Sequence, residues 1–122
     1  MLGYVTLGSN QFDKAAEFYD SLFALYGANR LMELEGFILW GTSLEVAAIA
    51  LSKPFNGEAA TVGNGVMAAI RADSKEAVDT IYNKAIELGG QDEGKPGQRG
   101  DGFYAGYFRD LDGNKLNAFH LG

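Results

Sequence analysis

Apolar and polar residues alternate near the start of the chain with a period of two, which is typical of a strand. Residues 2–7 predict this strand, with Tyr4 and Thr6 on one face and Val5 and Leu7 on the other. The period then changes. Apolar residues recur three and four positions apart, which indicates a helix with one apolar stripe.

This first helix is predicted from about residue 12 to residue 26. Asn10 is expected to cap its start, and Gly27 is expected to end it. Its stripe consists of Phe12, Ala15, Ala16, Tyr19, Leu22, Phe23 and Tyr26. Three short strands are predicted next, at residues 30–35, 36–40 and 45–52.

The same order of strand-like and helix-like patterns then repeats. Residues 66–72 predict a strand, and Asp73 with Glu76 predicts a capping box that starts a second helix, which Gly89 ends. The stripe of that helix is Ala77, Val78, Ile81, Tyr82, Ala85 and Leu88. Residues 91–102 are rich in glycine and predict a loop with at most one short strand. Residues 103–109 and 115–119 predict a closing hairpin, because Asp112-Gly113 suits a tight turn.

The chain therefore contains two cycles of strand, helix and strands, about 62 to 63 residues apart. We divide it into a first module at residues 1–55, a connector at 56–64 and a second module at 65–122, within a single domain. A small α+β domain with mostly antiparallel pairing in each half is the physical expectation.

Composition narrows the possible functions. The 122 residues suffice for one core, and 47% of them are hydrophobic. The net charge of -6 argues against a nucleic-acid partner, and the absence of cysteine excludes disulfides and thiolate chemistry. No apolar run reaches the length of a membrane span. No signal peptide is visible at residues 1–10, so a cytoplasmic protein is expected.

Four sequence strings, taken in order, carry a family resemblance. They are YVTLG at residues 4–8, AEFYD at 16–20, GNGVMAAIRA at 63–72 and FRDLDGNKLNAF at 108–119. Together they resemble the glyoxalase/bleomycin resistance protein/extradiol dioxygenase superfamily, the vicinal oxygen chelate fold. The resemblance covers essentially the whole chain. It implies two βαβββ modules that form a curled mixed sheet around a cavity, and it implies a homodimer.

The resemblance also indicates where a metal would be held. Metal-dependent members use a His on the first strand, a His on the fifth and a Glu on the eighth. The matching residues here are Tyr4, Met67 and Asn117, and residues 46–51 on the fourth strand are apolar. A protonated phenol, a thioether and a neutral amide are poor ligands for Ni, Zn or Fe. We therefore expect no metal and no cofactor, and we expect the familiar metal-dependent chemistry to be absent.

Other tempting residues have simpler interpretations. His120 points away from Asn117 and Phe119 by strand alternation, which favours a surface or interface histidine. The Asp110–Asn114 turn is too short for a calcium loop, and its acidic residues are expected to bond to the backbone. Residues 94–102 favour a flexible loop. The functional alternative is a lid whose Lys95 or Arg99 meets an anion.

Two classes of function remain. The first is a protein without the usual metal ligands that binds a small, partly aromatic or apolar molecule in a cleft. The second is a glyoxalase-like lyase or dioxygenase-related enzyme with a metal-independent site, in which Tyr4 is the candidate catalytic acid. A structural or regulatory dimer without a pocket is a third possibility. The candidate ligand-binding residues are Tyr4, Trp40, Met67, Arg71, Tyr104, Asn117 and Phe119.

Overall fold

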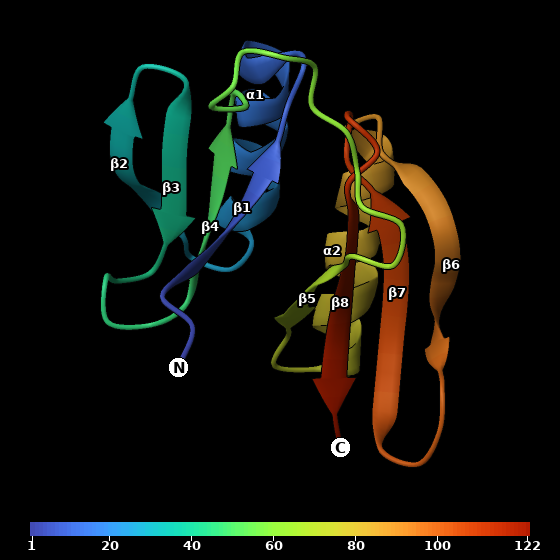
Figure 1. Ribbon diagram of the computed structural model, residues 1–122. Coiled ribbons are helices and arrows are strands. Elements are labelled where there is room, and N and C mark those ends of the chain that lie inside the picture. Colours follow the sequence, from blue (N-terminus) through green and yellow to red (C-terminus); the bar gives the residue numbers. More distant parts are fainter. The chain divides into compact units, whose positions relative to one another are not determined.

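The computed structural model describes residues 1–122 and confirms two βαβββ modules (Figure 1). The chain forms two compact units, Met1–Val62 and Gly63–Gly122. The first unit contains β1 (Tyr4–Gly8), α1 (Phe12–Ala24), β2 (Asn29–Leu34), β3 (Phe37–Gly41) and β4 (Ala48–Ser52). The second contains β5 (Ala68–Arg71), α2 (Lys75–Glu87), β6 (Gln91–Gln98), β7 (Phe103–Arg109) and β8 (Lys115–Leu121).

Each unit has one four-stranded mixed sheet with the same topology. The strand orders are β1-β4-β3-β2 and β5-β8-β7-β6. The first strand of each unit pairs in parallel with the last, and the other pairs are antiparallel. The sheets do not close, so each retains two edge strands. Neither helix is long and apolar enough to cross a membrane.

In the first unit, α1 packs on β2, β3 and β4. Its buried side chains include Tyr19, Leu22 and Phe23, and the rings of Tyr19 and Phe23 contact the Trp40 ring of β3. Burial of an aliphatic or aromatic side chain of this size contributes about 1.5–3 kcal/mol, so this helix face contributes strongly to the unit's stability. A smaller cluster, Leu39, Ala48 and Ala50 with Leu31 and Phe37, also packs in this unit.

In the second unit, α2 covers one face of the sheet and packs on β6, β7 and β8 (Figure 1). Its buried stripe is Val78, Ile81, Tyr82 and Ala85. Two tyrosine hydroxyls link helix and sheet. The Tyr82 hydroxyl donates to Asp92 over 2.6 Å, and the Tyr104 hydroxyl donates to Asp79 over 2.7 Å. Desolvation and this bond to Asp92 raise the pKa of Tyr82 to about 12, so its phenol remains a donor.

The helix ends differ in detail from the sequence prediction. Ser74, not Asp73, caps α2, because its hydroxyl accepts from the Ala77 backbone N–H at 3.0 Å. Gln11 occupies the cap position of α1. The Asn10 side chain instead bonds to Ala60 in the connector, donating to its carbonyl and accepting from its backbone N–H. The predicted capping roles of Asp73 and Asn10 are therefore wrong.

The largest difference concerns residues 91–98, which form the eight-residue strand β6 rather than a loop. Its register against β7 shifts twice, between Asp92 and Gly94 and between Gly94 and Gly97. Because β6 is an edge strand, its irregular backbone and Pro96 interrupt few ladder bonds. The flexible loop predicted for residues 94–102 is therefore part of a strand from Gly94 to Gln98.

The closing hairpin is confirmed, but its turn is longer than a two-residue Asp-Gly turn. Residues 110–114 connect β7 and β8, and Gly113 has a φ of 90°. Buried Asp110 organises the turn. Its carboxylate accepts from the backbone N–H groups of Asp112 and Asn114 and from the Asn114 side chain.

Candidate functional site

The second sheet has one face on α2 and one face opposite it. Tyr104 bonds to α2, and Gly106 lies against Tyr82, so these alternate residues of β7 face the helix. Their neighbours in sequence must face the other way. The cross-strand register then assigns the face opposite α2, here called the distal face, to alternate residues of three strands: Ala69, Arg71, Phe103, Ala105, Tyr107, Arg109, Lys115, Asn117, Phe119 and Leu121.

Asn117 lies at the centre of the distal face. It pairs with Ala69 of β5 on one side and with Tyr107 of β7 on the other. The side chain is only 2% exposed, and its carboxamide oxygen has no hydrogen-bond partner. More than nine in ten buried polar groups in proteins are paired, so an unpaired buried acceptor in mid-strand needs an explanation.

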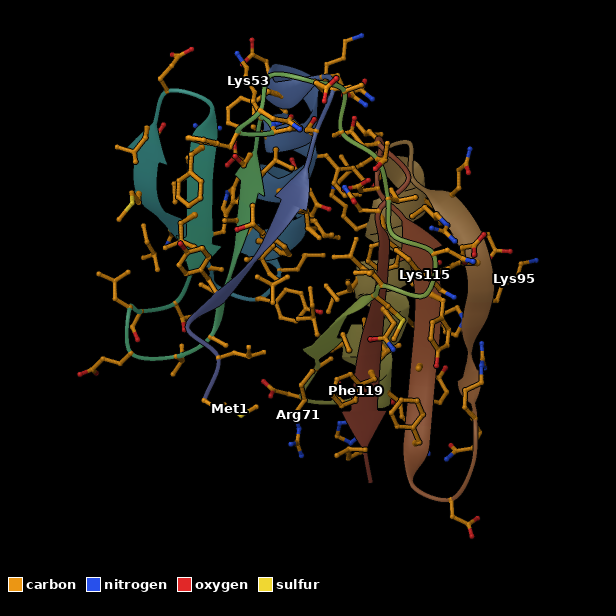
Figure 2. The ribbon with its side chains drawn as sticks, viewed as in Figure 1. Met1, Lys53, Arg71, Lys95, Lys115 and Phe119 are labelled. Carbon is orange, nitrogen blue, oxygen red and sulfur yellow. The ribbon has the colours of Figure 1, made fainter.

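Aromatic rings lie near this position on β7 and on β8 itself. The rings of Phe103 and Phe119 are stacked, with centroids 5.5 Å apart and planes 21° apart. Arg71 is the register partner of Phe119, and the two side chains lie beside one another in Figure 2. The distal face therefore combines a central amide, flat apolar rings and a guanidinium.

Tyr107 lies next to two cationic groups. The Arg99 guanidinium carbon is 5.5 Å from the centre of its ring, and the Lys115 ammonium nitrogen is 5.6 Å away. A Cβ at Gly97 would lie 2.8 Å from an Arg99 guanidinium nitrogen, so glycine there admits this side chain. Lys95, the other cation considered for this segment, projects from the outer edge of β6 (Figure 2).

Two predicted ligand-binding residues face a helix instead. Trp40 packs against α1, with ring centroids 5.7 Å from Tyr19 and 6.0 Å from Phe23. Tyr104 faces α2 through its bond to Asp79, which also raises the pKa of the Tyr104 hydroxyl. Both lie on the predicted strands, and both are on the side of their sheet that faces the helix.

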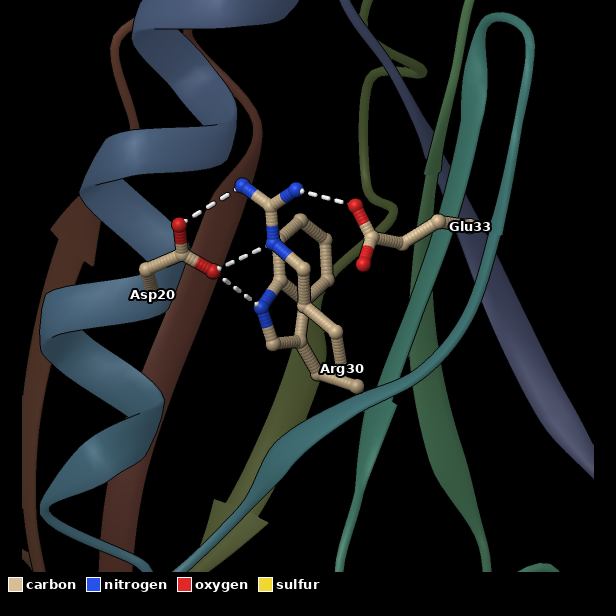
Figure 3. A network of polar contacts seen from close by, with 4 residues as sticks. Asp20, Arg30 and Glu33 are labelled. Atoms are coloured by element: carbon tan, nitrogen blue, oxygen red, sulfur yellow. Dashed lines mark hydrogen bonds and ion pairs between the residues drawn. The ribbon is translucent and has the colours of Figure 1, made fainter.

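The Trp40 indole belongs to a polar network that joins α1 to β2 and β3 (Figure 3). Asp20 accepts from the Trp40 indole N–H at 2.8 Å and from the guanidinium of Arg30 at 2.7 and 2.8 Å. Arg30 also pairs with Glu33. The hydrogen bond from Arg30 lowers the pKa of Asp20 below its ordinary value. This network explains the position of Trp40 without any ligand.

The first unit also contains two surface hollows. One, of about 330 Å³, lies between the start of α1 and residues 53–59, and the other, of about 670 Å³, lies between α1 and β2. No predicted site residue lines either of them. The basic residues there already have partners, since Arg30 pairs with Asp20 and Glu33, and Lys53 pairs with Glu35. The distal face of the second unit is therefore the stronger candidate site.

The family assignment follows from comparison with known proteins. Residues 1–118 match the family described as Glyoxalase/Bleomycin resistance protein/Dioxygenase superfamily. The chain belongs to this superfamily. A glyoxalase/bleomycin resistance protein from Albidiferax ferrireducens T118 is 32% identical, with a TM-score of 0.92 over 100% of this chain and 99% of that chain.

Two more distant structures share the glyoxalase-superfamily fold. The hypothetical protein SA1046 from S. aureus is 24% identical, with a TM-score of 0.77 over 99% of this chain and 93% of that one. A lactoylglutathione lyase from Agrobacterium tumefaciens is 20% identical, with a TM-score of 0.69 over 98% and 92%. At these identities the likeness shows the fold alone. None of the curated proteins compared with the chain matches it.

Metal-dependent members of the glyoxalase superfamily need a donor set that these residues do not fit. Tyr4 is 54% exposed on the first unit, and its ring meets Phe37 edge-to-face. Met67 is exposed just before β5 and offers a soft thioether, while Asn117 offers a neutral carbonyl. No three His, Asp or Glu side chains are grouped so that they could hold a metal ion. A divalent ion would meet no anionic ligand from these three positions.

The remaining predicted residues are placed as follows. Asn117, Phe119 and Arg71 come together on the distal face, and alternation places Met67 on the same side as Ala69. His120 points the other way, as predicted, with its Nδ1 3.0 Å from the Ala72 carbonyl. Sequence reasoning missed Lys115, although its alternation with Asn117 and Phe119 along β8 is a signal that finds it.

Proposed function

We propose that this protein binds a small, partly aromatic organic molecule on the distal face of its second sheet, without a bound metal ion. The observation that carries the proposal is the Asn117 carboxamide, which is buried with an unpaired oxygen. Leaving a buried acceptor unsatisfied costs about 1–3 kcal/mol. A ligand that donates a hydrogen bond to this oxygen would offset that cost on binding.

The surroundings of Asn117 support a flat ligand. Ala69 of β5, a small residue, pairs with Asn117 on one side, and the flat Tyr107 ring belongs to its partner on β7. The stacked rings of Phe103 and Phe119 offer an apolar surface at one end. Aromatic surfaces with a few polar anchors are typical of sites for small organic molecules.

A lyase that uses Tyr4 as an acid has less support. General acid catalysis needs a proton donor that is positioned beside the reacting atom and is often tuned by neighbours. Tyr4 is exposed, and β1 and its partner β4 contain no ionisable side chain besides it. Binding without chemistry, by contrast, requires only shape and a few hydrogen bonds.

Replacing Asn117 by leucine tests the proposal. We expect fragments with a flat ring to shift the amide NMR signals of β5, β7 and β8 in the wild-type protein, and these shifts to disappear in Asn117→Leu. The unfolding free energy should stay unchanged or rise by about 1 kcal/mol, because the apolar side chain removes an unpaired acceptor. Loss of binding together with retained stability separates a binding role from a structural one.

The matched control is Asn83→Leu, which makes the same change on the exposed surface of α2 and should leave the shifts in place. Chelator treatment before the titration should also leave binding unchanged. A library that shifts no signal on these three strands, or equal binding by the Asn117 variant, contradicts the proposed function. Binding that disappears with the chelator contradicts its metal-free part.

We also propose a homodimer. Large apolar side chains remain exposed in both units, among them Leu34, Leu44, Phe55 and Val66. A second copy of the chain would cover part of this exposed apolar surface. Light scattering after size-exclusion chromatography at micromolar concentration should give twice the mass of one chain. The mass of a single chain under these conditions would rule the dimer out.

A further inference from the structure

We infer that the molecule bound on the distal face is an organic anion, a flat carboxylate that also donates a hydrogen bond to Asn117. This inference rests on the proposed function and names its ligand class. The first observation is the distribution of charge. The chain has 16 acidic and 10 basic residues, yet β5, β7 and β8 contain no Asp or Glu.

The basic residues of these strands are not neutralised by acidic partners, with one exception. Arg109 pairs with Glu93 at 3.3 Å. Arg71 and Lys115 take part in none of the ion pairs of the structure, and neither does Arg99 at the end of β6. An otherwise acidic protein therefore presents three cations without ion-pair partners, Arg71 and Lys115 on the distal face and Arg99 against the Tyr107 ring. A positive site on a negative protein selects for anions.

Two of these cations are held in place before any ligand arrives. Arg99 and Lys115 both lie against the Tyr107 ring, at 5.5 and 5.6 Å from its centre. Arg99 also donates to the Lys95 carbonyl, which fixes its guanidinium over the glycines of β6. Long basic side chains lose rotamer freedom when they bind a ligand, and this loss is smaller when packing already restricts them.

The spacing along β8 defines the shape of the ligand. Lys115 and Asn117 are two residues apart on the same face, so their Cα atoms are about 7 Å apart along the strand. A six-membered ring with substituents at opposite positions spans this separation. Its carboxylate would meet the Lys115 ammonium, and its hydroxyl or amino group would donate to the carboxamide oxygen of Asn117. Hydrogen bonds that involve a charged group are stronger than neutral ones.

The test uses 4-hydroxybenzoate as the probe and calorimetry as the measurement. Two analogues separate its functional groups: 4-hydroxybenzyl alcohol lacks the charge, and 4-methoxybenzoate lacks the donor. We expect wild-type protein to bind 4-hydroxybenzoate at least roughly tenfold more tightly than either analogue. Added salt should weaken binding of the two carboxylates and leave binding of the alcohol unchanged.

Lys115→Met should weaken 4-hydroxybenzoate binding roughly tenfold. The control is Lys14→Met, which changes the net charge equally on the exposed surface of α1. This control should alter the binding by less than about twofold. Equal binding of the alcohol and the acid, equal effects of the two variants, or no binding of 4-hydroxybenzoate would overturn the anion inference. The proposed function would still hold after such a result if neutral fragments shift the amide NMR signals of β5, β7 and β8. It is contradicted only when no fragment shifts these signals.

Discussion

Trp40→Ala should lower the unfolding free energy by about 3–5 kcal/mol. The side chain is 2% exposed and packs against Tyr19 and Phe23 of α1, so truncation leaves a cavity between helix and sheet. It also removes the indole N–H that donates a hydrogen bond to Asp20. Domains of this size are typically stable by only 5–15 kcal/mol, so much of that margin would be lost.

Urea denaturation followed by far-ultraviolet circular dichroism measures this change, because Trp40 is the only tryptophan and its fluorescence is lost with it. Trp40→Phe is the matched variant. It keeps an aromatic ring in the cavity and loses the bond to Asp20, so we expect a loss of about 1–2 kcal/mol. Fragment binding on the second unit should be unaffected in Trp40→Phe. Weakened binding there would restore Trp40 as a ligand-binding residue.

The second large effect is expected at the closing turn. Asp110→Ala should destabilise the protein by about 2–4 kcal/mol, because three donors in or next to this turn lose their acceptor. The Asp110 side chain is 3% exposed, and its two oxygens lie 2.8–3.0 Å from the backbone nitrogens of Asp112 and Asn114 and the Asn114 amide. Thermal and urea unfolding monitored by circular dichroism provide the measurement.

Two variants show whether the carboxylate itself matters. Asp110→Asn keeps an oxygen for the two backbone donors but turns an amino group toward the Asn114 amide, so an intermediate loss is expected. Asp101→Ala removes an exposed carboxylate from the β6–β7 turn, at the other end of β7, and should change stability by less than about 0.5 kcal/mol. A loss in Asp101→Ala as large as in Asp110→Ala would mean that net charge, not the turn, determines the effect.

Much of the fold could be predicted because the spacing of apolar residues distinguishes strands from helices in both modules. Side chains of residues 4–8 alternate between the two faces of a strand. In both helices, apolar residues recur three or four positions apart. Strand β6 was not predicted because its residues, among them Gly94, Pro96 and Gly97, do not alternate between apolar and polar. Edge strands tolerate such residues, and only tertiary pairing with β7 reveals the strand.

The candidate site was predictable in part, for reasons that differ between strands. Strand β8 mixes Lys115 and Asn117 with apolar neighbours, so alternation assigns its faces. Strand β3 is buried on both faces from Ile38 to Gly41. Its sequence therefore does not indicate on which face of the sheet the Trp40 side chain lies. Tyr104 is similar, because β7 is apolar or small at nearly every position. Packing against the helices decides both cases.

The parallel pairing of first and last strands has a consequence for the order of folding. Tyr4 pairs with Ala48, and Ala68 pairs with Leu116, so each sheet is completed by a contact between segments more than forty residues apart. Closing such a loop carries a larger entropic cost than forming the local hairpins β2-β3 and β7-β8. On a ribosome, each unit would hold its opening strand unpaired until its final strand is synthesised. The first unit can finish its sheet while the second is still being made.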